Sequence, residues 1–476
     1  MPPTCHHDAL HLDVSPHAAD VGFTRPPLAK RAAAATPSGR ALSARLVKPA
    51  TGNTPICHLE LDPESLFPGP LVLPGDGLSV DPKEPPQSLR SWNNDRMRNH
   101  ITSERNTIYV APTPSMADGM RPVLASWAVP SVLPAPLKGR CNPPDPENVR
   151  AYLEAFYHPL PVKLLPANIS FVRWTDAGGS GKQPRYIGLQ AGDGVTRITT
   201  RPCPDETYPR QLSLNDILDT ALEILPNDAY ALVMLTDHDL YEDEDDDFCC
   251  GRAYGNDRIA VVSSARYHPL LDEPAGIELE HMWPFSHCEA YVTRMCKEAE
   301  PARPSKRHRK APKPSAEPTA STETTESPMA RVIQAGLAVP PPTDSHTGLW
   351  LSRMARTVSH EVGHCFCLDH CSYYACVMQG TAGIVEDVRQ PPYLCLVCLA
   401  KLGYALAGFV DGRVGQVQLM LEQYVALAKF CDKWKRVAMF AAYGNWLEQR
   451  ITVECERHNI PVEYQAHRRQ TRPLFT

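Results

Sequence analysis

The stretch HEVGHCFCLDHCSYYACVMQG, residues 360–380, carries a dense set of metal-binding side chains and guides the interpretation of the whole chain. It begins with the pattern His-Glu-x-x-His, in which His360 and His364 are four positions apart. On a helix this spacing places both imidazoles on one face, one turn apart, so that both can bind the same ion. Glu361 lies one step round the helix, where its carboxylate is placed to contact a water on that ion.

Two further residues make this short pattern more specific. His370 follows His364 by six positions, where a chain leaving the helix can return a third ligand. Three imidazoles leave one coordination position open for water, which is typical of a catalytic zinc site. Met378 follows in a turn-like stretch and is expected to form an apolar floor. The set predicts a zinc-dependent metallopeptidase in which Glu361 activates a zinc-bound water as general base and then acts as general acid.

Four cysteines predict a second metal site directly after the histidines. Cys371 and Cys376 are followed, after 18 residues, by the pair Cys395 and Cys398. Two close thiol pairs joined by a short loop suit a closed, structural zinc site. A disulfide arrangement is the alternative, and it is disfavoured in a reducing compartment.

The composition indicates a chain that can bury a large core and has no strong charge bias. Its 476 residues are 43% hydrophobic and the net charge is −6. Residues 1–30 lack the apolar run of a secretory signal. The sequence contains no run of about 18 apolar residues, so we expect no membrane-spanning helix. We expect a cytoplasmic or nuclear protein that is not secreted, with peptide or protein substrates, no membrane contact and little affinity for nucleic acid. The oligomeric state stays open.

Proline usage, 48 residues in all, divides the chain. Residues 1–145 are expected to be a mostly disordered Pro-rich segment, with a few apolar residues that could dock on the domain, namely Trp92, Ile108, Tyr109 and Trp127. Residues 146–476 are expected to form the metallopeptidase domain. A low-complexity stretch at about 298–342 is expected to be a disordered insertion. Its basic cluster, Lys306–Lys310, suits a nuclear import signal and a solvating charge run equally well. The acidic run Glu242–Asp247 is interpreted as a solvated loop.

Hydrophobic periodicity predicts alternating helices and strands after residue 146. Ser213 is the predicted N-cap of an amphipathic helix that Pro226 ends. Ala229–Thr236 (AYALVMLT) predicts a buried central strand. Further helices are predicted at Val149–Tyr157, at Leu349–Cys367 and from about Gly415 through Phe430, and further strands at Ile169–Trp174, Tyr186–Gln190 and Ile259–Ser264.

The ligand pattern resembles that of the archaemetzincins, a family of metzincin-clan zinc metallopeptidases. The family pattern is His-Glu-x-x-His-x-x-Gly-x-x-His-Cys, then four residues, Cys, any residue, Met, and a downstream Cys-x-x-Cys. The matching residues are His360, Glu361, His364, His370, Cys371, Cys376, Met378, Cys395 and Cys398. The resemblance covers roughly residues 148–431 without the insertion.

This resemblance implies an α+β fold with a mixed sheet, an active-site helix, a zinc-binding turn and a Met-turn below the metal. It implies two zinc ions, one catalytic on the histidines and one structural on the four cysteines, and small peptides as substrates. By the same resemblance, residues 258–264 would form the edge strand that pairs with the substrate backbone.

One position departs from the family pattern, because Cys367 stands where the family has glycine. That glycine would allow a sharp turn after the helix with a positive φ. A cysteine on the same backbone costs on the order of 1–2 kcal/mol.

Two other functions remain open. A non-catalytic, zinc-stabilised interaction protein derived from a peptidase would account for the altered turn, although Glu361 has no use in a purely structural site. A nuclear nucleic-acid binder would use the four cysteines and the basic stretch, although few Lys or Arg residues surround those cysteines. The oxyanion-stabilising group is not identified, and Tyr373, Tyr374 and Arg389 are the candidates nearest in sequence.

Overall fold

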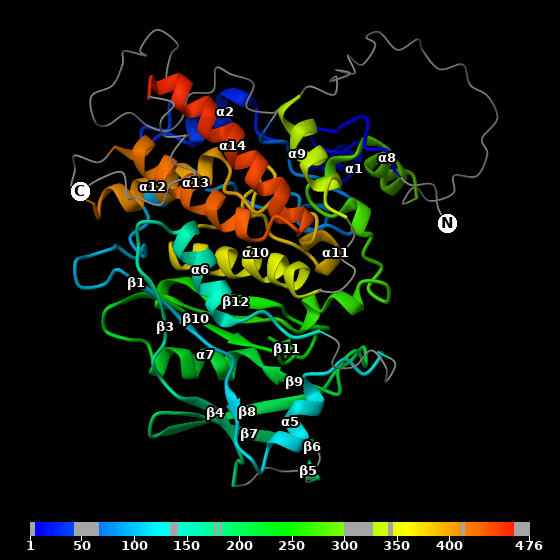
Figure 1. Cartoon of the computed structure of the whole chain (residues 1–476), viewed down its shortest axis with the longest axis vertical. Coiled ribbons are helices and arrows are strands. Elements are labelled where there is room, and N and C mark those ends of the chain that lie inside the picture. Colours follow the sequence, from blue (N-terminus) through cyan, green and yellow to red (C-terminus); the bar gives the residue numbers. More distant parts are fainter. Residues whose placement is uncertain are drawn as a thin grey trace, which may run out of the picture.

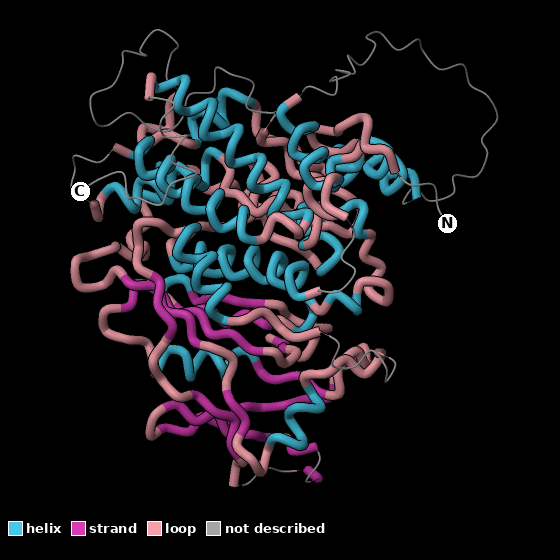
Figure 2. Tube along the Cα trace, in the orientation of Figure 1, coloured by secondary structure: helices cyan, strands magenta, loops and turns pink. Residues whose placement is uncertain are grey.

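The computed structural model describes residues 5–41, 66–133, 141–175, 179–180, 183–298, 327–340, 346–410 and 415–460. Within them the chain forms a mixed α/β fold, so the predicted combination of helices and sheets is confirmed. Most helices gather in one half of the molecule, and the strands, with a few helices among them, form the other half (Figures 1 and 2). No helix of these residues combines the length and hydropathy that a membrane crossing requires.

The bounds of the helices and strands, in chain order, are as follows. The helices are α1 (His17–Val21), α2 (Leu28–Ala34), α3 (Gly77–Val80), α4 (Leu89–Asn93), α5 (Arg121–Trp127), α6 (Pro146–Phe156), α7 (Leu214–Glu223), α8 (Glu289–Glu298), α9 (Pro328–Leu337), α10 (Thr347–Cys365), α11 (Ile384–Asp387), α12 (Leu396–Ala407), α13 (Gln416–Lys433) and α14 (Ala438–His458). The strands are β1 (Thr107–Ala111), β2 (Ser115–Met116), β3 (Val162–Leu164), β4 (Ile169–Val172), β5 (Gly179–Ser180), β6 (Gln183–Pro184), β7 (Tyr186–Ala191), β8 (Gly194–Pro202), β9 (Arg210–Ser213), β10 (Ala229–Thr236), β11 (Leu240–Tyr241), β12 (Gly251–Tyr254) and β13 (Ile259–Ser263).

A five-stranded sheet in the order β12-β13-β10-β1-β3 forms the centre of the molecule. Every residue of β10 is buried, and β10 runs parallel to both β1 and β13. A strand covered on both faces needs apolar side chains in both directions, which explains its continuous apolar sequence. The predicted central strand is therefore confirmed.

Each face of this sheet is covered by different elements. Helices α6 and α10 cover one face, and α7 covers the other, where it also contacts the second sheet, β11-β9-β8-β7-β4-β2 (Figure 1). Beyond α10, helices α12, α13 and α14 add a further helical layer around the fully buried Trp446. The active-site helix predicted from the sequence thus lies between the central sheet and this layer.

The predicted disordered segment at residues 1–145 needs correction for the part that the structure describes. Strand β1 lies in this segment, yet it is an inner strand of the central sheet. Phe67, Leu73 and Trp92 are almost completely buried in the cores. Pro-rich extended stretches have no periodicity, but they can still bury single large side chains against a finished domain, and that burial orders them. The ordered chain therefore begins well before residue 146.

The predicted disordered insertion at about 298–342 also needs correction at its end. Residues Pro328–Leu337 form α9, whose N-cap Ser327 accepts a hydrogen bond from the Ala330 amide and which packs on α14. The basic cluster Lys306–Lys310 lies outside the described residues. At the C-terminal end, the predicted last helix is α13, and a separate α14 follows it after a short turn.

The edge strand expected at residues 258–264 is wrong. Strand β13 is an inner strand, because β12 pairs with it in antiparallel register and occupies the edge. The chain leaves β10, passes the acidic loop at residues 242–247 and returns as β12 before it enters β13. The exposed edge of the sheet therefore belongs to Gly251–Tyr254.

Candidate metal centre and cleft

Helix α10 positions the first two histidines. Its buried side, which includes Ala355, Val358 and Val362, packs into the core and fixes the helix, so that His360 and His364 lie on its opposite side. Their ring centroids are 4.6 Å apart, and their Nε2 atoms are 2.9 Å apart.

His370 completes the group after the chain leaves α10. Its ring centroid lies 5.4 Å from that of His360 and 5.1 Å from that of His364. One ring nitrogen of each histidine lies within 4.8 Å of those of the other two. The structure thus brings together the three histidines predicted from the sequence, with the spacing of ligands to a single ion.

The outward nitrogen of each ring has its own partner. His360 Nδ1 lies 2.7 Å from the Val377 carbonyl oxygen, and His364 Nδ1 lies 2.7 Å from the Leu368 carbonyl oxygen. His370 Nδ1 lies 3.1 Å from the Glu84 carboxylate. Carbonyl and carboxylate partners hold the proton on Nδ1, and the Nε2 lone pairs then face the shared point.

Glu84 was not identified from the sequence. It lies in a Pro-rich stretch, residues 81–86, that offers no periodicity and no motif. A carboxylate 286 residues before its histidine partner has no local signal, and only the folded path of the N-terminal segment brings the two together. That segment therefore contributes a side chain to the candidate metal centre.

The electrostatics of the histidines suit metal binding. Burial, with the neighbouring His370, lowers the pKa of His360 to about 3. Burial, together with His360 and His370, holds the pKa of His364 well below its ordinary value. Both rings are therefore neutral near pH 7, which is the form that binds metal.

Glu361 lies beside the histidines and against the edge strand. Its carboxylate is buried, and a Cβ placed on Gly251 would lie 3.2 Å from its Cγ and 3.3 Å from its Oε1. Burial raises the pKa of Glu361 to about 8, and Arg252 opposes that shift. A carboxyl group with a pKa in this range can accept and return a proton near neutral pH.

The turn after α10 has the conformation that the family glycine predicts. Cys367 has φ of 57°, in the left-handed region. Its amide donates to the His364 carbonyl at 2.7 Å, and the Leu368 amide donates to the Gly363 carbonyl at 3.2 Å. This pair of hydrogen bonds is the Schellman arrangement that usually has glycine at the position of Cys367. The positive φ expected from the sequence is confirmed, and Cys367 adopts it in spite of the strain that its Cβ causes.

Met378 lies directly below the metal-binding helix. A Cβ placed on Gly363 would lie only 2.5 Å from the Met378 sulfur, so the methionine is packed against the helix where it has no side chain. The Met378 carbonyl accepts a hydrogen bond from the Cys371 amide at 2.7 Å, which closes the loop between them. Met378 is fully buried, as the floor predicted from the sequence requires.

The four predicted cysteines also come together. One sulfur from each of Cys371, Cys376, Cys395 and Cys398 lies within 4.8 Å of the others, and all four are buried. The hydrogen bond with Cys376 is the main cause that holds the pKa of Cys371 well below its ordinary value. The buried Lys401 also lowers that pKa and so favours a thiolate in this group.

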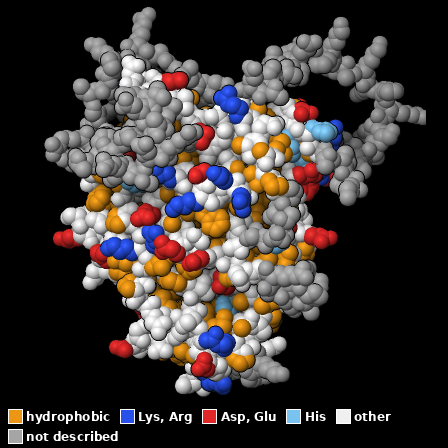
Figure 3. Space-filling view, viewed as in Figure 1, with side chains coloured by type: hydrophobic (Ala, Val, Ile, Leu, Met, Phe, Trp, Pro, Cys, Tyr) orange, Lys and Arg blue, Asp and Glu red, His pale blue; other side chains and the backbone are white. Residues whose placement is uncertain are grey.

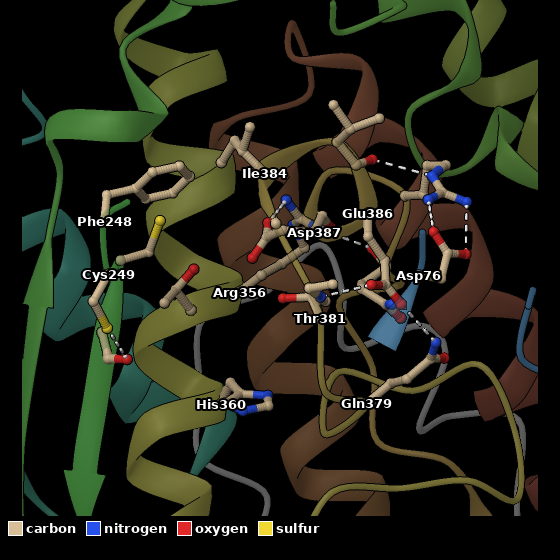
Figure 4. A pocket seen from close by; sticks show the side chains of 18 of the residues that line it. Asp76, Phe248, Cys249, Arg356, His360, Gln379, Thr381, Ile384, Glu386 and Asp387 are labelled. Atoms are coloured by element: carbon tan, nitrogen blue, oxygen red, sulfur yellow. Dashed lines mark hydrogen bonds and ion pairs between the residues drawn. The ribbon is translucent and has the colours of Figure 1, made fainter. Parts of the chain in front are cut away.

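The histidines open onto two cavities on either side of Glu361. One, of about 560 Å³, is lined by all three histidines and by Gly251–Ala253 of β12. The other, of about 620 Å³, extends from His360 along the segment 379–390 (Figure 4). The acidic side chains that line the larger cavity are Asp76, Asp245, Asp246, Asp247, Glu361, Glu386 and Asp387.

Most of the charge in the larger cavity is already paired or hydrogen-bonded. Arg356 pairs with Asp387 at 2.8 Å, and Arg389 pairs with the buried Asp76. Burial raises the pKa of Glu386, and its carboxyl group accepts hydrogen bonds from the Ala382 amide at 2.7 Å and from the Gly77 amide at 2.8 Å. The negative charge that remains at the cavity mouth comes from the acidic loop. That loop is largely exposed and uses its carboxylates to accept its own backbone amides, as predicted for a solvated loop.

The three oxyanion candidates from the sequence do not reach the reacting centre. Tyr373 and Tyr374 are buried against the N-terminal segment, where the Tyr373 hydroxyl donates to the Pro86 carbonyl and Arg25 lies over the Tyr374 ring. Arg389 is occupied by Asp76. Among the described residues that line the smaller cavity, Arg252 is the only Lys or Arg.

Sequence comparisons identify relatives of this chain. Residues 333–404 match the sequence model of peptidase family M54. Archaemetzincin-2 of Homo sapiens is 25% identical over 384 residues, which are 80% of this chain and 79% of that protein. The archaemetzincin of Aeropyrum pernix is 44% identical over 55 residues, which are 12% of this chain and 30% of that protein.

The match to the crystal structure of the archaemetzincin from Methanopyrus kandleri covers 64% of this chain and 97% of that chain, with 17% identity and a TM-score of 0.30. In sequence, the chain is thus similar to the archaemetzincins and to peptidase family M54, as the pattern from His360 to Cys398 predicts.

Proposed function

We propose that this protein is a zinc metallopeptidase that hydrolyses peptide bonds. The observation that carries the proposal is the geometry of the three histidines, whose Nδ1 atoms are held by Val377, Leu368 and Glu84. Three imidazoles with one open position form the donor set of a catalytic zinc site. A zinc ion on His360, His364 and His370 would supply Lewis acidity to the carbonyl and to water.

Glu361 is the residue that we assign to proton transfer. It is buried beside His360 and faces the gap between α10 and β12, where a peptide carbonyl would lie. Its carboxylate takes a proton from the attacking water and returns that proton to the nitrogen of the leaving amine, so no net charge is left in the site.

Strand β12 is the element that we assign to substrate binding. It is the outermost strand of its sheet, and Gly251, Arg252 and Ala253 line the smaller cavity beside the histidines. An extended peptide can add to this edge through backbone hydrogen bonds. We assign Arg252 to stabilising the developing oxyanion, because it lines the smaller cavity beside the histidines. Its side chain is 53% exposed and lies 3.3 Å from Glu242.

The larger cavity favours a basic side chain in the substrate. Its paired acids contribute little, but Asp245, Asp246 and Asp247 at its mouth have no Lys or Arg salt-bridge partner among the described residues. These carboxylates would attract a Lys or Arg side chain of the substrate and repel an Asp or Glu side chain.

We assign a second zinc ion to the four cysteines, where it stabilises the loop that carries His370 and Met378. A non-catalytic interaction protein is less well supported, because a structural site does not need the buried Glu361 or the two cavities. A nucleic-acid binder is also less well supported. On the face shown in Figure 3, the acidic and basic side chains of the described residues are interspersed without a basic patch.

The test is cleavage of a mixed peptide library by the zinc-loaded protein beside Glu361→Gln at equal zinc content. We expect the wild type to cleave, with Lys or Arg enriched at one position next to the scissile bond, and the variant to be inactive. Equal cleavage by both proteins would refute the role of Glu361. Absence of cleavage by a fully zinc-loaded wild type would favour the non-catalytic interaction protein.

A further inference from the structure

The N-terminal residues lie along the segment that leads into α8. The His11 amide donates to the His287 carbonyl at 2.8 Å, and the Glu289 amide donates to the Ala9 carbonyl at 3.0 Å. Leu10 and Cys288 form an antiparallel bridge between these bonds. This pairing brings Cys5 next to Cys288, although the two are 283 positions apart in the chain.

Cys5, Cys288 and His281 form a third cluster of metal-binding side chains. The sulfurs of Cys5 and Cys288 are 3.2 Å apart. A ring nitrogen of His281 lies within 4.8 Å of both. Cys288 and His281 are buried, and Cys5 is half-buried. The cluster is separate from the histidine centre and from the four cysteines.

The surroundings of His281 leave one nitrogen for a ligand. His281 Nδ1 lies 2.6 Å from the Glu278 carboxylate, which Arg294 holds from the other side at 2.6 and 2.7 Å. His281 Nε2 is buried and has no hydrogen-bond partner among the described residues. A buried, unpaired ring nitrogen costs free energy unless something binds it. A carboxylate on Nδ1 is the usual partner of a metal-binding histidine.

His7 lies next to this cluster, but it is not one of the three residues whose ligand atoms lie within 4.8 Å of one another. Its Nδ1 is also buried without a partner among the described residues. Its ring centroid lies 5.7 Å from that of His281. His7 has φ of 52°, an uncommon conformation for a residue with a side chain.

We propose that Cys5, His281 and Cys288 bind a zinc ion, and that the neighbouring His7 ring turns toward it to take the fourth position. Two thiols and two imidazoles form a closed tetrahedral set that prefers zinc over harder cations. On binding, each thiol loses its proton to solvent, and the two thiolates neutralise the charge of the ion. The site has no open position, so its role is to fasten the N-terminal segment to the domain.

A zinc ion at this site would cross-link Cys5 and Cys288, which are 283 positions apart in the chain. A cross-link between residues so far apart removes a large loop-closure entropy from the unfolded chain. The fastened segment is also tied to a later part of the chain, because the Gly69 amide donates to the Leu12 carbonyl and His287 Nε2 lies 3.1 Å from the Gly69 carbonyl oxygen.

The test is the zinc content of the full-length protein, purified under reducing conditions and dialysed against buffer without zinc. We expect Cys5→Ser to hold one zinc fewer per chain than the wild type, and Cys288→Ser the same. Cys296→Ser, a nearby cysteine of α8 outside the cluster, is the matched control and should retain the wild-type zinc content. Cys5 is only half-buried, so Cys5→Ser remains informative if Cys288→Ser does not fold.

Two results would overturn the proposal. One is equal zinc content in the wild type and in Cys5→Ser. The other is a Cys5–Cys288 disulfide in the freshly purified chain, detected by mass spectrometry without reduction, since a disulfide uses the same sulfurs. Zinc content is measured independently of peptidase activity, so a protein that cleaves no peptide would still show the difference in zinc content between Cys5→Ser and the wild type. His370→Ala should lose a different zinc ion, the one at the three histidines.

Discussion

Replacing Cys367 by glycine is predicted to stabilise this protein. Cys367 is the left-handed residue that ends α10, with φ of 57°. A residue with a Cβ in this region costs on the order of 1–2 kcal/mol. Glycine removes that cost. It also raises the conformational entropy of the unfolded chain, which lowers the free energy of unfolding by about 0.5–1 kcal/mol. The thiol makes only long contacts, 3.8 Å to the Met97 carbonyl and 3.7 Å to Asn256, so its loss costs little.

The expected net gain is about 1 kcal/mol in the free energy of unfolding. Urea unfolding of the zinc-loaded protein, followed by tryptophan fluorescence at fixed zinc concentration, measures it. Cys367→Ala is the matched control, because it removes the thiol and keeps the strain. It should be no more stable than the wild type. If Cys367→Gly were destabilised, or if both variants changed equally, the strain argument would be refuted.

Three further predictions concern zinc binding at the histidines and the pH dependence of stability. Glu84→Ala should weaken zinc binding at the histidines by about 10- to 100-fold, measured by competition with a chelator, because His370 loses the partner of its Nδ1; unchanged affinity would contradict this role. Gly380→Ala places a Cβ 2.7 Å from His370 Nδ1 and should also weaken zinc, whereas Gly383→Ala, with nothing within 4 Å, should not. Burial lowers the pKa of His287 to about 4. Below its unfolded pKa of about 6.5 only the unfolded chain binds this proton, so stability falls by on the order of 3 kcal/mol as the pH drops from 6.5 to 4. His287→Asn should reduce that acid dependence in urea unfolding, and an unchanged slope would exclude His287 as its source.

The elements that the sequence predicts well are those with a strong local signal. Strand β10 is a short apolar run between turn residues, and α7 has its N-cap at Ser213 and an amphipathic face. Helix α10 contains the His360–His364 spacing, which is itself helical. In each case the local pattern and the final packing agree.

The features that the sequence does not reveal depend on contacts between distant segments. Glu84 meets His370 only in the folded chain, and the exposed sheet edge passes to β12 because the chain doubles back after β10. The N-terminal segment has no period to detect, yet Trp92 is fully buried and its indole N–H donates to the Phe366 carbonyl at 2.8 Å. The sequence indicates Trp92 as an apolar residue that could dock on the domain, but it does not show which distant segment Trp92 contacts.

The most direct test of the central claim is zinc restoration. The protein is stripped with a chelator and titrated with zinc, while cleavage of the best library peptide is followed. The account predicts that activity disappears on stripping and returns with zinc. It also predicts that Glu361→Gln binds zinc equally well but stays at least about 100-fold slower. Full activity without zinc, or near-normal cleavage by zinc-loaded Glu361→Gln, would contradict it.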